Sequence, residues 1–196
     1  MLVDEAILGR RSVKVFDARP VPSALIERCL SLAVWAPNHK LTEPWRFTVV
    51  TGEARGELSR RIRQDLKTLD PAMSWAQLEA SVLKHHRKIT SAPVIIVVYA
   101  LEGDDPLRSR ENYAATAAAI ENLLLGAHSM ELGAIWRTGS IFEGTHVREF
   151  LHAPPHSQFV GAVYLGYSAQ RDTPRRRTDV RNQTYWVPAT DGTRDL

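Results

Sequence analysis

Pro93 opens the unbroken apolar run Val94-Ile95-Ile96-Val97-Val98-Tyr99. No polar residue interrupts this run, so neither side of its pleat is suited to water. Continuous apolar runs of this length are typical of a central strand that is buried on both faces. The stretch therefore predicts a sheet that has protein packed against both of its sides.

The flanking sequence supplies the other elements. Apolar periodicity and the positions of proline and glycine predict three more strands, the second of them short. These strands cover residues 45–51, 134–138 and 159–167. Helical spacing predicts helices over residues 4–10, 23–36, 53–69, 74–89, 108–132 and 145–151.

The longest predicted helix, residues 108–132, has an unusually apolar middle between Ala114 and Ile120. A helix that is apolar around much of its circumference is buried, and its small residues permit close approach of a partner helix. Gly133 follows at the position expected for a helix cap.

These elements indicate an α+β fold with a small central sheet between helices. We find no internal repeat, low-complexity tract or linker, so residues 1–196 are expected to form a single domain. The tail from about residue 171 to 196 is basic and holds too few apolar residues for a core of its own. We expect it to pack on another surface, that of a second subunit.

The composition argues against a membrane-spanning, disulfide-bonded or secreted protein. No apolar run reaches the roughly 18 residues that a membrane span needs. Cys29 is the only cysteine, so no internal disulfide can form, and it lies on an apolar helix stripe where core packing is expected. Asp4 and Glu5 near the start argue against a secretory signal. A cytoplasmic protein without a membrane partner is predicted.

A nucleic-acid partner is not predicted. The formal charge is only +3, although arginines crowd the tail at positions 171, 175, 176, 177 and 181. No aromatic residue is interleaved among them, as single-stranded nucleic-acid binding would favour. A compact phosphate ligand suits such a cluster better.

Several familiar catalytic sites lack their motifs. There is no G-x-G-x-x-G after a strand, no phosphate-binding Gly-Lys-Ser and no G-x-S-x-G elbow. His85 and His86 are adjacent rather than four apart, and the other histidines are scattered, so no metal site is predicted. These absences favour an enzyme whose chemistry belongs to a bound cofactor.

The segment Arg10-Arg11-Ser12-Val13-Lys14-Val15-Phe16-Asp17 resembles the opening signature Arg-x-Ser-x-Lys-x-Phe of the nitroreductase superfamily. That resemblance implies that Arg10 and Ser12, with the adjoining Arg11, hold the phosphate and ribityl chain of FMN. It also implies that Lys14 approaches the N1–O2 edge of the flavin.

A second segment, Ala36-Pro37-Asn38-His39-Lys40-Leu41-Thr42-Glu43-Pro44-Trp45, resembles the family pattern Ala-Pro-x-x-x-x-x-Gln-Pro-Trp, and closely the short-chain subgroup. Glu43 replaces the usual glutamine. The resemblance implies that Trp35, Asn38 and His39 complete the flavin site of the opposite subunit.

A third segment, Gly133-Ala134-Ile135-Trp136-Arg137-Thr138-Gly139, resembles the subgroup's Gly-Gly-Ile-Trp-Arg-Ser-Gly. It implies cofactor contacts by Trp136, Arg137 and Thr138. Pro174-Arg175-Arg176-Arg177 resembles a late Lys-x-Arg of larger members, which implies that Arg175 and Arg177 face the phosphate.

The resemblance spans nearly the whole chain. It implies a dimeric α/β/α sandwich with a small, mostly antiparallel sheet, and flavin sites at the subunit interface. The implied activity is FMN-dependent transfer of a hydride from NADH or NADPH, through flavin N5, to an electron-poor nitroaromatic or quinone by a ping-pong mechanism. No side chain would react covalently.

Other interpretations stay open at this point. The same fold could support ene reduction, dehalogenation or dehydrogenation, or a flavin-binding regulatory module without turnover. The residues also have structural explanations. Arg10 and Arg11 could be cations near a helix end, Lys14 a surface residue, His39 a loop residue, and Trp35 and Trp136 packing residues.

Overall fold

A four-stranded sheet is the central layer of the part of the chain that the computed structural model describes, residues 1–170 and 176–187. All three neighbouring strand pairs are antiparallel, in the order β1-β2-β4-β3. The strands are β1 (Trp45–Thr51), β2 (Val94–Leu101), β3 (Gly133–Arg137) and β4 (Ser157–Gly166). All four predicted strands are confirmed, and the run that follows Pro93 lies inside the sheet, between β1 and β4.

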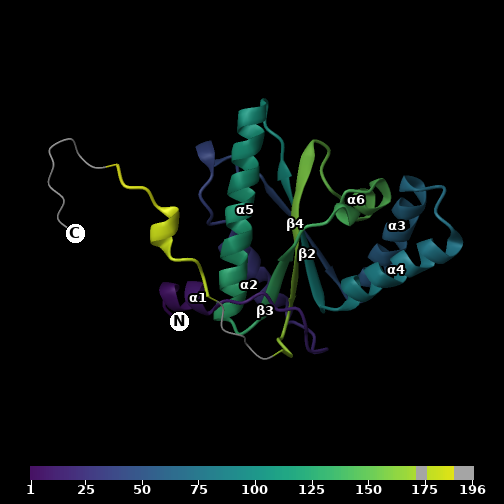
Figure 1. The fold of residues 1–196 in the computed structure, drawn as a ribbon, viewed down its shortest axis with the longest axis horizontal. Helices are drawn as coiled ribbons and strands as arrows, with labels where there is room; N and C mark the ends of the chain where they lie inside the picture. Colours follow the sequence, from purple (N-terminus) through teal and green to yellow (C-terminus); the bar gives the residue numbers. More distant parts are fainter. Residues whose placement is uncertain (171–175, 188–196) are drawn as a thin grey trace.

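Helices cover both faces of this sheet (Figure 1). One face carries α2 (Ser23–Ala33) and α5 (Pro106–Ser129), and the other carries α3 (Ala54–Leu69), α4 (Trp75–Thr90) and α6 (Thr145–Phe150). A first helix, α1 (Val3–Gly9), contacts α5. Three short turns of 3₁₀-helix complete the list: η1 (His39–Leu41), η2 (Ser140–Phe142) and η3 (Val180–Gln183). The predicted three-layer α/β/α sandwich is confirmed.

The alternation of side chains along β2 explains why two cores form. Ile96 and Val98 pack with α2 and α5, whereas Ile95, Val97 and Tyr99 pack with α3, α4 and α6. All five are fully buried. Complete burial of an aliphatic side chain contributes about 1.5–3 kcal/mol, so this single strand couples both helical layers to the sheet.

The long helix has different ends from those predicted. It begins at Pro106, because the Asp105 carboxylate accepts a hydrogen bond of 2.8 Å from the Arg108 amide and caps the first turn. It ends at Ser129, three residues before the predicted end. No helix in the described parts of the chain is long and apolar enough to cross a membrane.

The prediction that Gly133 caps this helix is wrong. The residue with left-handed backbone is Glu131, with φ of 60°. Gly133 instead starts β3, where a Cβ would lie 2.7 Å from Cγ2 of Val13. A glycine is needed there because the N-terminal segment packs directly against the strand.

Cys29 confirms its predicted role as a packing residue. Its side chain is fully buried between α2 and the sheet. Burial raises the pKa of the Cys29 thiol to about 11, so the reactive thiolate is disfavoured.

The C-terminal segment 176–187 projects away from the rest of the molecule (Figure 1). Every residue in it is exposed, including the apolar side chains of Val180, Tyr185, Trp186 and Val187. Within the segment, Arg181 forms an ion pair with Asp179. This segment does not pack on its own protomer.

Candidate functional site

The segment Arg10–Asp17 is held against the ends of β3 and β4 by its backbone. Ser12 forms a parallel bridge with Ala134, and the Val13 amide donates to the Ala134 carbonyl at 3.0 Å. Val13 is buried, whereas Ser12 and Lys14 on either side of it are exposed. Alternate residues of extended chain share a face, so this segment presents Ser12 and Lys14 on the same side.

Gln170 clamps the same segment from beyond β4. Its Oε1 accepts a 2.8 Å hydrogen bond from the Lys14 amide, and its Nε2 donates to the Ser12 carbonyl at 3.3 Å. No local pattern predicts a role for Gln170, because the contact spans more than 150 positions.

The two arginines of this segment are partly engaged within the protomer. Arg10 Nε lies 3.2 Å from Glu121 Oε1 on α5. Arg11 Nη1 donates to the Leu8 and Arg10 carbonyls at the end of α1. A guanidinium has five N–H donors, so the Arg10 contact to Glu121 leaves donors for a phosphate.

The loop between α2 and β1 has an uncommon backbone. Lys40, Leu41 and Glu43 all have positive φ, at 55°, 52° and 43°. Such conformations cost non-glycine residues energy and persist only where other contacts impose them. Asn38 provides two of these contacts, since its Oδ1 accepts from the Glu43 amide at 2.9 Å and its Nδ2 donates to the Ala36 carbonyl at 3.3 Å.

Two side-chain contacts tie this loop to α5. His39 Nδ1 lies 2.9 Å from Glu111 Oε2, and Thr42 Oγ1 lies 3.1 Å from Asn112 Oδ1. Trp35, just before the loop, is largely uncovered, with 82 % of its surface exposed.

Arg10 and His39 contact α5 at two different positions along the helix. Their carboxylate partners, Glu121 and Glu111, are ten residues apart on that helix, which corresponds to about 15 Å at 1.5 Å per residue. The structure therefore brings Arg10, Ser12 and Lys14 together at one place, and Asn38 and His39 together at another. It does not join the two groups within one protomer.

β3 sends its two predicted site residues to opposite faces of the sheet. Trp136 packs on the α2/α5 side, where its Nε1 donates to the Val160 carbonyl at 3.2 Å. Its indole covers Gly161, where a Cβ would overlap the ring. Thr138 follows the strand and is exposed.

Arg137 lies on the other face, with its guanidinium carbon 5.0 Å from the ring centre of Tyr164. The Nε of Arg137 and the hydroxyl of Tyr164 are both buried without a hydrogen-bond partner among the described residues. Burial raises the pKa of Tyr164 to about 12. Buried donors without partners are rare in proteins, so these two atoms indicate a place for a ligand acceptor.

Basic residues of α4 share this region. Burial, and then the charges of Arg137 and Lys84, hold the pKa of Lys88 below its usual value. The pKa of His85 is also lowered, first by burial and then by the charges of Lys88 and Lys84. Lys84 and Lys88 are four residues apart on α4, so they share one face of the helix.

The chemistry of these groups fits FMN. A phosphate requires cations and hydroxyl donors, which Arg10 and Ser12 supply. The electron-rich edge of a flavin requires positive charge or N–H donors, which Lys14 and Arg137 supply. Of the tail residues, Arg177 is exposed on the projecting segment, and Arg175 lies outside the described residues.

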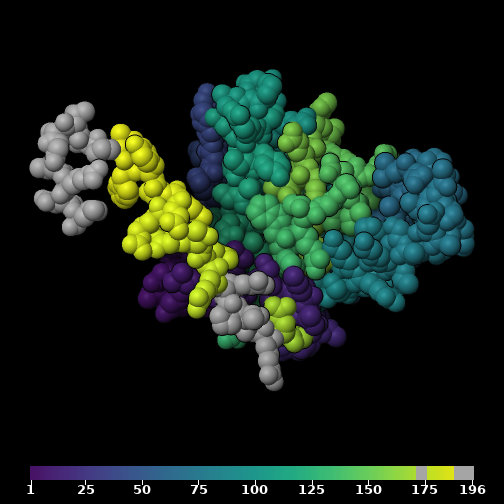
Figure 2. Space-filling view, in the orientation of Figure 1, coloured from purple at the N-terminus to yellow at the C-terminus, as the bar shows by residue number. Residues whose placement is uncertain are grey.

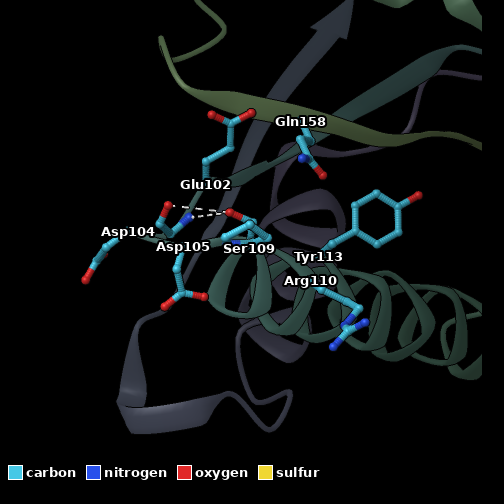
Figure 3. Close-up of a pocket in the computed structure, with 9 residues that line it drawn as sticks. Glu102, Asp104, Asp105, Ser109, Arg110, Tyr113 and Gln158 are labelled. Carbon is cyan, nitrogen blue, oxygen red and sulfur yellow. Dashed lines mark hydrogen bonds between the residues drawn. The ribbon is translucent and has the colours of Figure 1, made fainter.

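A separate hollow of about 640 Å³ lies at the start of α5 (Figure 3). Glu102, Asp104 and Asp105 line it, but their carboxylates point in different directions. Asp105 is occupied as the helix cap, and Ser109 Oγ accepts from the Gly103 amide at 3.0 Å. None of the predicted site residues lines this hollow.

The model of the nitroreductase family matches residues 7–167 of the chain. The protein belongs to the nitroreductase family. The match includes all three segments described above and ends before the projecting tail.

Relatives and solved structures agree with this membership. YfhC of Bacillus subtilis (strain 168), which carries a provisional NAD(P)H nitroreductase name, is 29 % identical over 180 residues, covering 91 % of each chain. A nitroreductase-like family protein from Bacillus cereus superposes with a TM-score of 0.84 at 27 % identity, over 95 % of this chain and 96 % of that one. The FMN-dependent nitroreductase NfnB from Mycobacterium smegmatis, solved in complex with NADPH, shares the fold at a TM-score of 0.73 and 17 % identity, over 94 % and 97 % of the two chains.

Proposed function

We propose that this nitroreductase-family chain is an FMN-dependent oxidoreductase that uses NADH or NADPH to reduce an electron-poor acceptor of nitroaromatic or quinone type. Family membership and the names of its relatives support the reaction class. The observation that carries the cofactor assignment is the pair of buried donors at Arg137 and Tyr164 that lack a partner among the described residues, with the charge of Lys88 near Arg137.

Each residue group has a distinct task in this proposal. Arg10, Arg11 and Ser12 hold the phosphate and ribityl chain, and Arg175 and Arg177 add positive charge. Lys14 and Arg137 face the pyrimidine edge, while Trp136 and Thr138 support the wall of the site. FMN held there would supply hydride transfer at N5 between the nicotinamide and an acceptor that later occupies the same place, which would give ping-pong kinetics.

We further propose that each site is completed by a second copy of the chain. The approximately 15 Å between the anchors of Arg10 and His39 along α5 supports this, because neither group closes a flavin site alone. In a two-fold dimer, the loop of one copy can face the first segment of the other. Trp35, Asn38 and His39 would then contact the flavin of the partner.

Exposed apolar surface supports the same homodimer. Ile7 and Leu8 of α1 are exposed, and so are the apolar side chains of the segment 176–187. Figure 2 shows that segment extending beyond the body of the protomer. We propose that it packs on the partner subunit, because uncovered apolar side chains of this number favour an interface.

The test is an absorbance spectrum of the purified protein, followed by anaerobic addition of NADH or NADPH. Flavin bands near about 450 nm that bleach on addition of either nucleotide, and return with a quinone, are expected from the chemistry of the cofactor. A protein that binds no FMN after reconstitution would refute the assignment. Bound flavin that neither nucleotide bleaches would refute the proposed reaction.

A further inference from the structure

We propose that His39 donates the proton that must accompany hydride transfer to the acceptor, and that Glu111 is its positioning residue. This inference rests on the proposed function, because it gives His39 a chemical task within the same site. His39 would act in the site of the partner subunit.

The contact between the two residues defines which nitrogen can act. His39 Nδ1 and Glu111 Oε2 are 2.9 Å apart. A carboxylate can only accept, so Nδ1 carries the hydrogen of this bond. Nε2 has no hydrogen-bond partner in the described parts of the chain, and it is therefore the nitrogen that can give up or take a proton.

Two charged groups lie beside the ring. Glu111 Oε2 lies beside the imidazole, and Arg108 Nε is 3.8 Å from the same oxygen. The other charged groups of the loop are Lys40 and Glu43, one of each sign. Half of the His39 side chain is exposed, so solvent can restore its proton after each turnover.

The loop gives the ring a fixed position. Asn38, inside the loop, holds its left-handed residues through a hydrogen bond with the Glu43 amide. Thr42 ties the loop to α5 through its hydrogen bond with Asn112. A general acid is effective only when it is held within hydrogen-bond reach of the atom that it protonates. The Thr42 contact lies one position along α5 from the Glu111 contact but involves no titrating group, which makes it a matched control.

The reaction requires one proton for each nucleotide oxidised. For a quinone, acceptor plus NAD(P)H plus H⁺ gives hydroquinone plus NAD(P)⁺. The nicotinamide is oxidised, both quinone oxygens gain O–H bonds, and the additional proton comes from His39 Nε2. The neutral ring then takes a proton from water.

The experiment separates the two half-reactions in FMN-loaded protein by stopped flow. Bleaching by NAD(P)H requires no proton donation to an acceptor, so His39→Gln should slow bleaching much less than it slows reoxidation. Reoxidation by a quinone should slow at least about tenfold, because general acids typically contribute 10²–10⁴-fold. Its solvent deuterium isotope effect should change in H39Q, whereas Thr42→Val should keep the wild-type isotope effect. FMN affinity, measured by fluorescence, should stay within about threefold of wild type in T42V, and the two half-reactions of H39Q are compared at saturating FMN.

A second readout needs no flavin. In the unloaded protein, ¹⁵N NMR of the His39 ring should show hydrogen on Nδ1 in the wild type and loss of that preference in Glu111→Ala. The same substitution should lower kcat for the quinone with little change in its KM, and Glu111→Asp should recover part of the rate.

These outcomes distinguish the inference from the proposed function. Wild-type reoxidation rates and isotope effects in H39Q would overturn the proton role of His39. An equal loss of reoxidation rate and isotope effect in T42V would show that His39 only holds the loop. An unchanged ring tautomer in E111A would overturn the role of Glu111. Failure of the wild-type protein to bind or reduce FMN would instead count against the proposed function.

Discussion

Glycine is required in this protein where another side chain occupies the space of a Cβ. At Gly161 the indole of Trp136 lies directly over the backbone, and at Gly144 the Asp65 carboxylate does so. Neither glycine has left-handed backbone, so the constraint is one of space rather than of conformation. At the scale of single residues, close packing explains positions that motif matching leaves without a reason.

Substitution of Gly161 by alanine should destabilise the fold. The new methyl would force Trp136 away from its hydrogen bond with the Val160 carbonyl. Overpacking of this kind typically costs about 1–3 kcal/mol. Urea denaturation of Gly161→Ala measures the loss of unfolding free energy.

Gly56→Ala is the matched control. Gly56 lies in α3, and nothing lies within 4 Å of its added Cβ. Alanine in a helix interior should raise the stability by about 0.5–1 kcal/mol. Equal effects of the two substitutions would contradict the packing explanation for Gly161.

Side-chain alternation along β3 shows how much an element can be predicted from sequence. Apolar runs bounded by proline and glycine gave all four strands, since these signals are local. The three-residue match Trp136-Arg137-Thr138 predicted joint cofactor contacts, but a strand sends Trp136 and Arg137 to opposite faces. The Arg137–Tyr164 contact depends on pairing with β4, which no local pattern specifies.

The loop before β1 shows where sequence signals end. The prolines of this loop predict where it begins and ends. However, no glycine marks the positions with left-handed backbone, residues 40, 41 and 43. Those conformations are imposed by Asn38 and by contacts with α5. The position of His39 beside Glu111 could not be predicted for the same reason.

α6 depends on a cap from another helix. Asp65 of α3 is nearly buried and accepts hydrogen bonds of 3.0 Å from the His146 and Val147 amides, with His146 Nδ1 at 2.8 Å. Loss of a capping carboxylate costs about 0.5–2 kcal/mol. We expect Asp65→Ala to reduce the free energy of unfolding by an amount in the upper part of this range, as measured by thermal or urea denaturation.

Asp70→Ala provides the comparison for this cap. Asp70 follows the end of α3, is exposed, and its carboxylate makes no hydrogen bond among the described residues. Its removal should change stability by less than about 0.5 kcal/mol. If both aspartates gave the same small change, the cap would not stabilise α6 as described.

At the scale of the whole molecule, the projecting segment 176–187 exposes large apolar side chains that no part of its own protomer covers. Tyr185 and Trp186 are each more than 80 % exposed. The sequence indicated that this tail has no core of its own, but not that it extends away from the protomer. The surface on which the segment packs belongs, in our proposal, to the partner subunit, so the sequence of one chain does not reveal it.

Tyr185→Ala with Trp186→Ala should weaken the proposed dimer, because large aromatic anchors dominate interface energies. Sedimentation at decreasing protein concentration should show a dissociation constant at least tenfold higher than that of the wild type. Trp75→Ala is the control, since Trp75 is also exposed but lies at the start of α4 on the opposite side of the sheet. An unchanged dimer in the double variant would show that the segment does not contribute to association.

The central claim is that each flavin site is built from two copies of the chain, and complementation between inactive copies tests it most directly. One variant, Arg10→Ala with Ser12→Ala, removes the phosphate anchors. Another, Trp35→Ala with Asn38→Ala, disrupts the loop. Each variant alone should retain little FMN. Unfolded and refolded together, they should recover flavin, because every mixed dimer contains one site with both halves intact. If mixing recovers no flavin although mixed dimers form, the site does not combine these two segments across the interface, and the account is wrong.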